Sequence, residues 1–379
     1  MKSLRIPALG AVLSLAVTAF VGPSVAAASE TETAAEILRA GAERGVDNGY
    51  PGVIGLVRDD ADTEYVHAGR GDWYRKVPAD PETRFRIGSN TKAFIAAVLL
   101  QLEAEKRLSL DDTLDTWLPR VVDTGDHDGS AITVRQLLNH TSGLPEYMND
   151  PRVLVSYTAN LNPHKRWRPQ ELVDIALDHA PTGAPGERPS YSNTNYQLAG
   201  MVIEAVTGNS PDLEVRERIL TPLGLHDTDF PTDPEPQGDW LRGYFRVGGL
   251  PPRDVTVSNV QATGAAGAMV STLDDLARFE RALLSGELFP EPQLAELKNI
   301  VPITEDGSGG IGLGVFLTET RCGPAWQHSG AVLGYTTLWL TSDDGSKQVV
   351  VAANEYHLIG GTPREQHVAQ AALDAYCAL

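Results

Sequence analysis

A serine and a lysine three positions apart, Ser89 and Lys92, stand at the start of a long apolar pattern in the sequence. The apolar run 93–102 repeats at helical spacing, which places Ser89 at or near a helix N-terminus and Lys92 one turn later on the same face. A serine hydroxyl becomes an effective nucleophile when a nearby base accepts its proton, and a lysine amine can be that base when burial keeps it neutral. The helix N-terminus also offers free backbone N–H groups that suit a developing oxyanion. The pattern therefore predicts nucleophilic catalysis by Ser89 with Lys92 as its base.

The same spacing also has a plain structural interpretation. Ser89 could cap the helix and Lys92 could be a solvated residue of its first turn, because short motifs have many chance matches. Against this, the chain contains no other Ser-x-x-Lys, and a lysine beside Phe94 and Ile95 is an unusual choice for a solvated position. The motif needs support from elsewhere in the chain.

A second polar pair, Tyr191 and Asn193, follows the loop 183–186 and precedes a helical pattern that begins near Tyr196. In extended backbone, residues two apart point the same way, so the phenol and the amide could face one cleft. A phenol near a lysine ammonium can have its pKa lowered and pass a proton, and the amide can bond both Lys92 and a substrate carbonyl. The alternative is an asparagine N-cap beside a half-buried tyrosine.

A third group, His328-Ser329-Gly330-Ala331, lies at the end of a predicted strand. Gly330 would permit the close backbone approach of a substrate, and His328 could donate a proton or electrostatic help to the hydroxyls of Tyr191 and Ser89. Alone, a strand-end histidine is most simply a polar surface residue, and the chain has nine histidines. The three groups carry weight together because each comes from a different part of the chain.

The elements that would position these groups are a helix and hairpin at the start, a mostly helical middle, and strands at the end. The clearest expected helices are 31–47, 134–138, 171–177, 196–206, 273–284 and 362–376, and the clearest strands are 53–58, 63–69, 312–317, 325–328, 334–340 and 348–353. We therefore predict an α/β (α+β) fold, in which a mostly antiparallel sheet is flanked by helices and carries an inserted all-helical lobe. The sheet lobe would take residues about 29–88 and 285–379 and the helical lobe about 89–284, with Ser89 at the seam where clefts form.

The N-terminus has the features of a secretory signal peptide. Lys2 and Arg5 precede an apolar stretch that ends in small residues, which predicts a signal peptide over 1–28 cleaved after Ala26 or Ala28. No second apolar run is long enough to span a membrane, and no cysteine near the cleavage site could carry a lipid anchor. We expect a secreted, monomeric protein without a membrane anchor.

The net negative charge of the chain limits the kinds of partner that it can bind. The net charge of −19 would become −21 once Lys2 and Arg5 left with the signal peptide. Binding to nucleic acid or to an anionic membrane needs clustered Lys and Arg, so neither is expected. The two cysteines, Cys322 and Cys377, are best interpreted as one disulfide in an oxidising compartment, although a buried free pair is the alternative.

Together the motifs resemble those of the penicillin-recognising serine hydrolases, the superfamily of D-alanyl-D-alanine carboxypeptidases and class C β-lactamases, over nearly the whole mature chain. The matching segments are Phe85-Arg86-Ile87-Gly88-Ser89, Leu137-Leu138-Asn139-His140-Thr141-Ser142-Gly143-Leu144, Tyr191-Ser192-Asn193-Thr194-Asn195-Tyr196 and Gly310-Ile311-Gly312-Leu313-Gly314. The resemblance implies that Ser89 is acylated with Lys92 as proton acceptor, that Tyr191 passes the proton to the leaving group, and that Asn193 orients the substrate amide. It also implies an oxyanion hole made by the backbone N–H groups of Ser89 and Ala331, a structural part for His140, and no metal or cofactor.

At position 328 this chain has a histidine where class C β-lactamases have a lysine, and in this it is more similar to the exported DD-carboxypeptidases and to related D-aminopeptidases and esterases. The placement of the two cysteines also looks like the carboxypeptidase arrangement. The resemblance thus favours D-alanyl-D-alanine carboxypeptidase/transpeptidase activity on peptidoglycan peptides, with β-lactams as acylating inhibitors. One departure concerns the substrate carboxylate, because Val315, Phe316 and Leu317 follow Gly314 where close relatives have an arginine.

Either another residue supplies the missing charge, with Arg152 and Arg321 as candidates, or the substrate is an ester or a neutral amide. A class C-like β-lactamase, an esterase or D-aminopeptidase, and a non-catalytic penicillin-binding sensor are the alternatives. A zinc hydrolase has no support from an H-E-x-x-H motif or a close His/Asp cluster.

Overall fold

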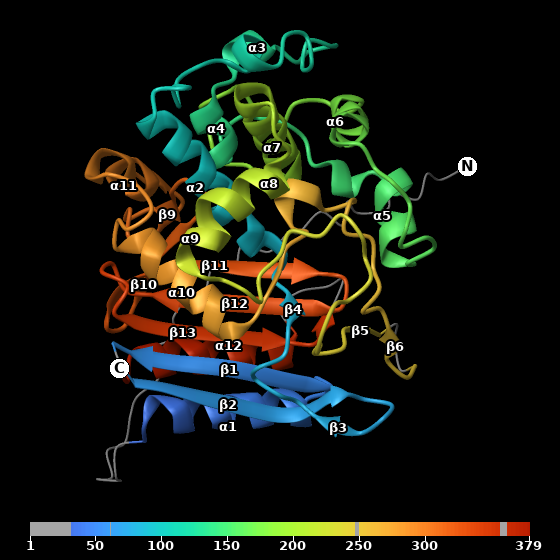
Figure 1. Ribbon diagram of the computed structural model, residues 1–379, viewed down its shortest axis with the longest axis vertical. Coiled ribbons are helices and arrows are strands. Elements are labelled where there is room, and N and C mark those ends of the chain that lie inside the picture. Colours follow the sequence, from blue (N-terminus) through green and yellow to red (C-terminus); the bar gives the residue numbers. More distant parts are fainter. Residues whose placement is uncertain (1–31, 61, 247–249, 357–361) are drawn as a thin grey trace.

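The computed structural model describes residues 32–60, 62–246, 250–356 and 362–379, and the predicted signal peptide lies outside these residues. A nine-stranded sheet has the order β3-β2-β1-β13-β12-β11-β10-β9-β8, so strands from both ends of the sequence join in one sheet. Its strand pairs are all antiparallel, with β1 against β13 joining the two halves. The helical lobe lies above one face of this sheet, and α1 and α12 lie on the other (Figure 1). The predicted antiparallel sheet with flanking helices is confirmed, whereas the inserted lobe, predicted to be all-helical, also contains the short strands β5, β6 and β7.

The helices and strands have the following bounds. The helices are α1 (Ala34–Asp47), α2 (Thr91–Ala104), α3 (Leu114–Trp117), α4 (Val134–Leu138), α5 (Pro151–Thr158), α6 (Pro169–Leu177), α7 (Asn193–Thr207), α8 (Pro211–Val215), α9 (Thr221–Leu223), α10 (Leu273–Leu284), α11 (Glu291–Lys298) and α12 (Pro363–Tyr376). The sheet strands are β1 (Gly52–Asp59), β2 (Asp62–Asp72), β3 (Val77–Pro78), β8 (Val301–Pro302), β9 (Gly310–Ile311), β10 (Phe316–Thr320), β11 (Gly323–Val332), β12 (Tyr335–Thr341) and β13 (Lys347–Ala353). Short strands β4 (Phe85–Arg86), β5 (Tyr244–Phe245), β6 (Arg253–Asp254), β7 (Val270–Ser271) and β14 (Glu355–Tyr356) make two smaller sheets, so the inserted lobe also holds some strand.

Both faces of the central strands are buried, and they serve different cores. Alternate residues of a strand point to opposite faces. Val53 and Val57 of β1 pack with α1 and α12, whereas Ile54 and Leu56 belong to the large core shared with the helical lobe. The sequences of the central strands are therefore continuous apolar runs, because a layer of helices covers each face of the sheet.

Helix α2 is the central helix of the molecule. Eleven of its residues are buried, which is typical of a helix surrounded by protein on all sides. Phe94 stacks on Phe279 of α10 with ring centroids 3.5 Å apart, which ties α2 to the layer next to the sheet. The rigid surroundings of α2 fix the positions of the residues at its N-terminus.

The strand expected over 312–317 is wrong in its bounds, because a turn separates β9 from β10. Gly314 has a φ of +78°, a left-handed conformation that interrupts a strand. A Cβ at this position would lie 2.8 Å from the Cβ of Ala96 and 3.0 Å from the carbonyl oxygen of Lys92. The turn thus presses directly on α2, and only a glycine fits between them.

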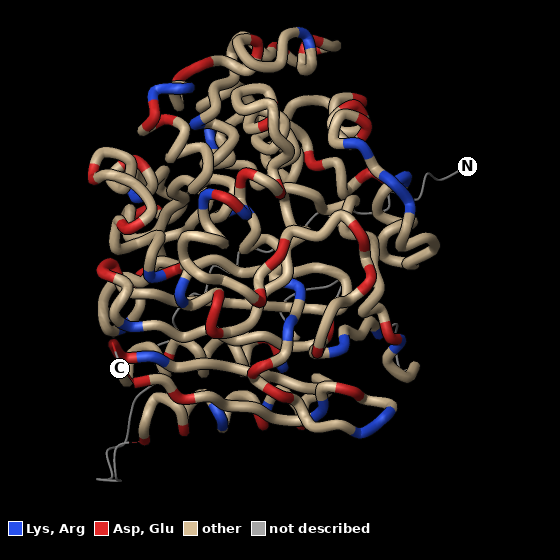
Figure 2. Tube along the Cα trace, in the orientation of Figure 1, with Lys and Arg blue, Asp and Glu red and all other residues tan. Residues whose placement is uncertain are grey.

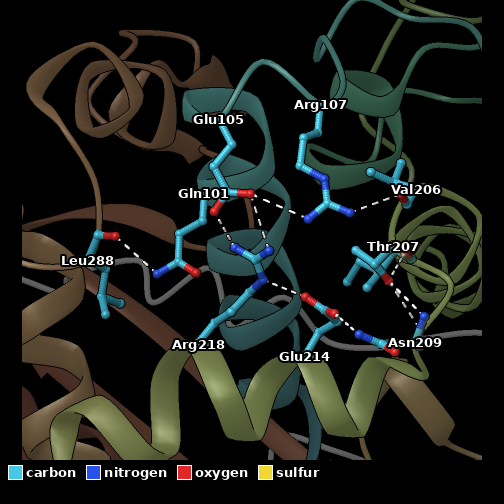
Figure 3. Close-up of polar contacts among 10 residues, drawn as sticks. Gln101, Glu105, Arg107, Val206, Thr207, Asn209, Glu214, Arg218 and Leu288 are labelled. Atoms are coloured by element: carbon cyan, nitrogen blue, oxygen red, sulfur yellow. Dashed lines mark hydrogen bonds and ion pairs between the residues drawn. The ribbon is translucent and has the colours of Figure 1, made fainter.

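Polar contacts hold the far end of α2 to its neighbours. Arg218, in the π-helical turn η4 (Arg216–Leu220), lies between Glu105 at the end of α2 and Glu214 of α8 and bonds both carboxylates (Figure 3). Gln101 reaches the carbonyl oxygen of Leu288 at 3.0 Å. Cys322 and Cys377 form a disulfide that ties α12 to the turn between β10 and β11.

The charged residues do not collect in one block. Figure 2 shows Asp and Glu spread over strands, loops and outer helices alike. Within the described residues, no helix combines the length and apolar character needed to cross a membrane.

Candidate active site

Ser89 lies in a tight turn directly before α2, as predicted. The 3-10 turn η1 (Gly88–Asn90) continues into α2, and the Thr91 side chain stabilises the junction by donating to the carbonyl oxygen of Gly88 at 2.7 Å. Gly88 has a φ of +55°, which turns the chain so that Ser89 faces the neighbouring strand β11. The nucleophile is thus held by backbone that has little freedom to move.

Lys92 is fully buried, one helical turn after Ser89. Its Nζ lies 3.0 Å from Ser89 Oγ, 2.8 Å from Asn193 Oδ1 and 2.7 Å from the carbonyl oxygen of Ala266. Burial lowers the pKa of Lys92 to about 7, while the nearby carboxylate of Glu146 acts in the opposite direction. The two carbonyl oxygens can only accept, so a neutral amine donates both of its N–H bonds to them and turns its lone pair toward Ser89.

Tyr191, in the loop before α7, contacts the same serine. Its hydroxyl donates to Ser89 Oγ at 2.9 Å. Burial raises the pKa of Tyr191 above its ordinary value, and Glu146 acts in the same direction. The expectation that a lysine ammonium would lower this pKa is therefore wrong, because desolvation of the buried phenol is the largest effect.

His140 fixes the Tyr191 ring. The two rings stack at 4.2 Å, and the backbone N–H of Ser192 donates to His140 Nδ1 at 3.2 Å. A ring nitrogen that accepts from a backbone N–H carries no proton, so the proton of this neutral imidazole is on Nε2. His140 therefore has the structural part that the sequence suggested, in direct contact with Tyr191.

Asn193 is the first residue of α7 and bridges Lys92 to a buried acid. Ser192 is the N-cap, donating its hydroxyl to the carbonyl oxygen of Pro145, and the Asn193 side chain is left free to reach Lys92. The backbone N–H of Asn193 donates to Glu146 Oε2 at 2.6 Å. The extended arrangement of Tyr191 and the placement of Asn193 bring both side chains to Ser89 and Lys92, as predicted.

His328 is buried, and its ring is neutral. Its Nδ1 lies 2.7 Å from the carbonyl oxygen of Ser329, which can only accept, so Nδ1 carries the proton. Burial and the charge of Lys92 lower the pKa of His328 to about 3, so the ring is neutral and Nε2 is an acceptor. In this state Nε2 can accept a proton but not donate one, and the suggested electrostatic help from His328 stays a prediction.

Strand β11 passes directly beside the nucleophile. A Cβ at Gly88 would lie 2.9 Å from the backbone nitrogen of Ala331, and one at Gly330 would lie 2.1 Å from the carbonyl oxygen of Ile87. The two glycines are thus needed for close approach of backbone to backbone, as expected for Gly330. This contact sets the backbone of Ser89 next to that of Ala331, the pair expected to bind an oxyanion.

Phe316 occupies the region where an arginine was expected. Its ring meets His328 edge-on at 5.1 Å and lies 6.5 Å from the Tyr191 ring, so this wall of the site is aromatic. Arg321 follows five residues later, about 16 Å further along an extended strand, and pairs with Asp374. Arg152 pairs with Asp150 and Asp178. Both candidate cations are therefore already committed to carboxylates.

Two contributors were missed by sequence reasoning. Glu146 lies two residues after the segment that ends at Leu144, and nothing in that loop indicates that its carboxylate reaches α7. Ala266 contributes only a backbone carbonyl, which no side-chain pattern can reveal. Among the described residues, no group of three or more His, Cys, Asp or Glu side chains is arranged to hold a metal ion.

Known proteins share this fold and much of this sequence. A Bacillus subtilis (strain 168) penicillin-binding protein is 28% identical over 335 residues, which cover 84% of this chain and 70% of the relative. The crystal structure of a D-stereospecific amidohydrolase from a Streptomyces species is 38% identical with a TM-score of 0.82, covering 89% of this chain and 98% of the other. A D-amino acid amidase from Ochrobactrum anthropi SV3 is 28% identical with a TM-score of 0.76, covering 89% and 97%.

The fold and the Ser-Lys-Tyr cluster define a serine hydrolase with the fold shared by β-lactamases and penicillin-binding proteins. The sequence profile of the Beta-lactamase family matches residues 33–373, and the chain belongs to this family. The resemblance to the penicillin-recognising serine hydrolases is thereby confirmed.

Proposed function

We propose that this serine hydrolase forms an acyl-enzyme on Ser89 and cleaves amides or esters of D-amino acids whose leaving group carries no carboxylate. The observation that carries the proposal is the set of three contacts around Lys92. With two carbonyl oxygens taking its N–H bonds, the amine has its lone pair free for the Ser89 proton. A pKa of about 7 keeps much of it neutral at neutral pH.

The reaction follows from the donors and acceptors in place. Lys92 accepts the proton of Ser89 as Oγ attacks the substrate carbonyl, and the backbone N–H groups of Ser89 and Ala331 bind the oxyanion. Tyr191 donates its hydroxyl proton to the leaving amine, and the Lys92 ammonium, whose nitrogen lies 4.9 Å from the centre of the Tyr191 ring, returns a proton to the phenolate. Water then releases the acyl group by the same path in reverse. One N–H of the Asn193 amide remains for a substrate carbonyl.

The leaving group is the point that separates the candidate activities. Burying a carboxylate beside Phe316, Tyr191 and a neutral His328 costs free energy unless a cation pairs with it. Lys92 is the only Lys or Arg of the described chain that bonds Ser89, Tyr191 or Asn193. A neutral amide or ester avoids this cost, and the similarity to the D-stereospecific amidohydrolase supports the same choice.

D-alanyl-D-alanine carboxypeptidase activity is the second candidate. It is supported by the similarity to the Bacillus subtilis penicillin-binding protein, and it would require a cation other than Arg152 and Arg321 in their present ion pairs. Export by the predicted signal peptide is also proposed, because a penicillin-binding relative suggests work at the cell envelope.

Turnover of matched substrates distinguishes these activities. D-phenylalanine amide is expected to be hydrolysed with kcat/KM at least about tenfold above that of L-phenylalanine amide and of a D-Ala-D-Ala peptide. The assay uses the mature chain, with Ser89→Ala as control and fluorescent penicillin as an acylation probe. Preferred turnover of the D-Ala-D-Ala peptide would overturn the leaving-group argument. Stable labelling by the penicillin without turnover of any substrate would indicate a sensor.

The pH dependence of kcat/KM reports the state of Lys92. Because the neutral amine is the active form and its pKa is about 7, kcat/KM should rise about tenfold per pH unit below pH 6 and level off above pH 8. Steady-state rates between pH 5 and 9 give this profile. A flat profile through pH 7 would mean that Lys92 is not the base.

A further inference from the structure

Glu146 is a buried acid in direct contact with the Ser89 machinery, and the proposed reaction leaves it without a part. It follows Pro145 in the loop before the 3-10 turn η3 (Tyr147–Asn149) and is 9% exposed. Its Oε2 accepts the backbone N–H of Asn193 at 2.6 Å and its Oε1 accepts that of Met148 at 2.8 Å. Two N–H donors favour the charged carboxylate, although burial raises the pKa of Glu146 above its ordinary value.

The Asn193 amide connects this carboxylate to Lys92. Asn193 Oδ1 accepts from Lys92 Nζ at 2.8 Å, and the Asn193 side chain lies near enough to Glu146 to lower the pKa of its carboxyl against the effect of burial. Because Oδ1 is the acceptor for Lys92, Nδ2 is the group that can donate to the carboxylate. Glu146 therefore fixes which way the amide points, and a flipped amide would present N–H groups to the N–H groups of Lys92.

We propose that Glu146 is a positioning residue for the Ser89 reaction. Its carboxylate orients Asn193 against Lys92 and is the counter-charge for the ammonium that forms when Lys92 accepts the Ser89 proton. This inference rests on the function proposed above. In the step, the Ser89 O–H bond breaks, an N–H bond forms on Lys92, and Oγ bonds the substrate carbonyl carbon. The new ammonium and the Glu146 carboxylate then form a neutral pair.

Other titratable groups around the pair do not supply this charge. The neighbours of Lys92 and Glu146 come from several elements: His140 after α4, Tyr147 in η3, Tyr191 and Tyr196 beside and within α7, and His328 of β11. Burial lowers the pKa of both histidines and raises the pKa of all three tyrosines, so these groups are neutral near pH 7. Glu146 is the carboxylate whose charge acts on Lys92.

A purely structural part for Glu146 predicts a different outcome from the same variants. As an acceptor for the N–H groups of Met148 and Asn193 it also stabilises η3 and the start of α7, so its loss could simply weaken folding. A structural part would change the melting temperature but leave the pH profile of each folded molecule unchanged. If Glu146 instead supplies a counter-charge to Lys92 and orients Asn193, its replacement should change both the pH profile and the rate of Ser89 acylation.

The experiment compares Glu146→Gln and Glu146→Asp with Glu280→Gln as a matched control. Glu280 is also buried but bonds Thr341 at the other end of β12 from the active site. The rate of Ser89 acylation by a nitrophenyl acetate ester, measured as a burst between pH 5 and 9, needs no knowledge of the natural substrate. Fluorophosphonate labelling counts the active sites, and thermal melting reports folding.

Glu146→Gln is expected to move the acidic limb of the acylation profile about one pH unit lower, because the ammonium of Lys92 loses its counter-charge. The plateau rate should fall at least about tenfold with little change in KM, since a misoriented Asn193 and a weaker base act on the chemical step. Glu146→Asp should restore the midpoint in part, and Glu280→Gln should keep the wild-type profile. A wild-type midpoint and plateau in Glu146→Gln would overturn the proposal. Wild-type protein that is not labelled at Ser89 would overturn the proposed function itself.

Discussion

Replacing Lys92 by methionine is expected to reduce kcat/KM about 10⁴-fold or more, the scale seen when one member of a concerted catalytic group is removed. Methionine fills a similar volume to lysine but has no amine, so the Ser89 proton loses its acceptor. Asn193 Oδ1 and the Ala266 carbonyl lose the N–H groups that now reach them at 2.8 and 2.7 Å. Steady-state kinetics and fluorophosphonate labelling of Ser89 measure the loss, and circular dichroism checks that the variant is folded.

Lys92→Arg separates the base from the charge. A guanidinium keeps a cation and several donors near Ser89, but it does not lose its proton at any pH at which a protein is assayed. If Lys92 is the base, this variant should be as inactive as Lys92→Met. Activity within about tenfold of wild type in Lys92→Arg would show that position 92 serves by charge and orientation. The acidic limb of the pH profile near 7 should disappear in both variants.

Sequence reasoning succeeded where a pattern is local and repeated. Helices α4 and α10 have the predicted bounds, because the spacing of apolar residues and a Thr N-cap mark both. Ser89 and Lys92 are one turn apart in the structure as in the sequence, so their contact follows from helix geometry alone. The antiparallel sheet that joins both ends of the chain followed from strands that had no other partners.

The misses depend on contacts and burial that the local sequence pattern does not report. Glu146 lies next to Asn193 only because the loop after α4 folds against the start of α7. The split between β9 and β10 depends on Gly314 packing on α2, since an apolar run that contains a glycine is equally consistent with one strand. The tautomer of His328 is set by the carbonyl oxygen of Ser329, and its neutrality by burial that no local pattern reports.

Tyr191→Phe is expected to lower kcat/KM for D-phenylalanine amide about 10³-fold, within the range for loss of a general acid. The phenol donates to Ser89 Oγ at 2.9 Å and keeps its proton because burial raises its pKa. An amine cannot leave without a proton, so the amide needs this donor. Phenylalanine preserves the stacking on His140 at 4.2 Å, which limits the change to the hydroxyl.

A nitrophenyl ester of the same acyl group is the matched substrate for this variant. Nitrophenolate leaves without a proton, so the Tyr191→Phe rate for the ester should fall about tenfold or less while the amide rate collapses. Single-turnover acylation of Ser89 by each substrate gives the two ratios directly. Equal losses for amide and ester would assign the hydroxyl to the attack of Ser89 instead of to departure of the amine. The difference between the two ratios therefore measures the proton that Tyr191 delivers to the leaving group.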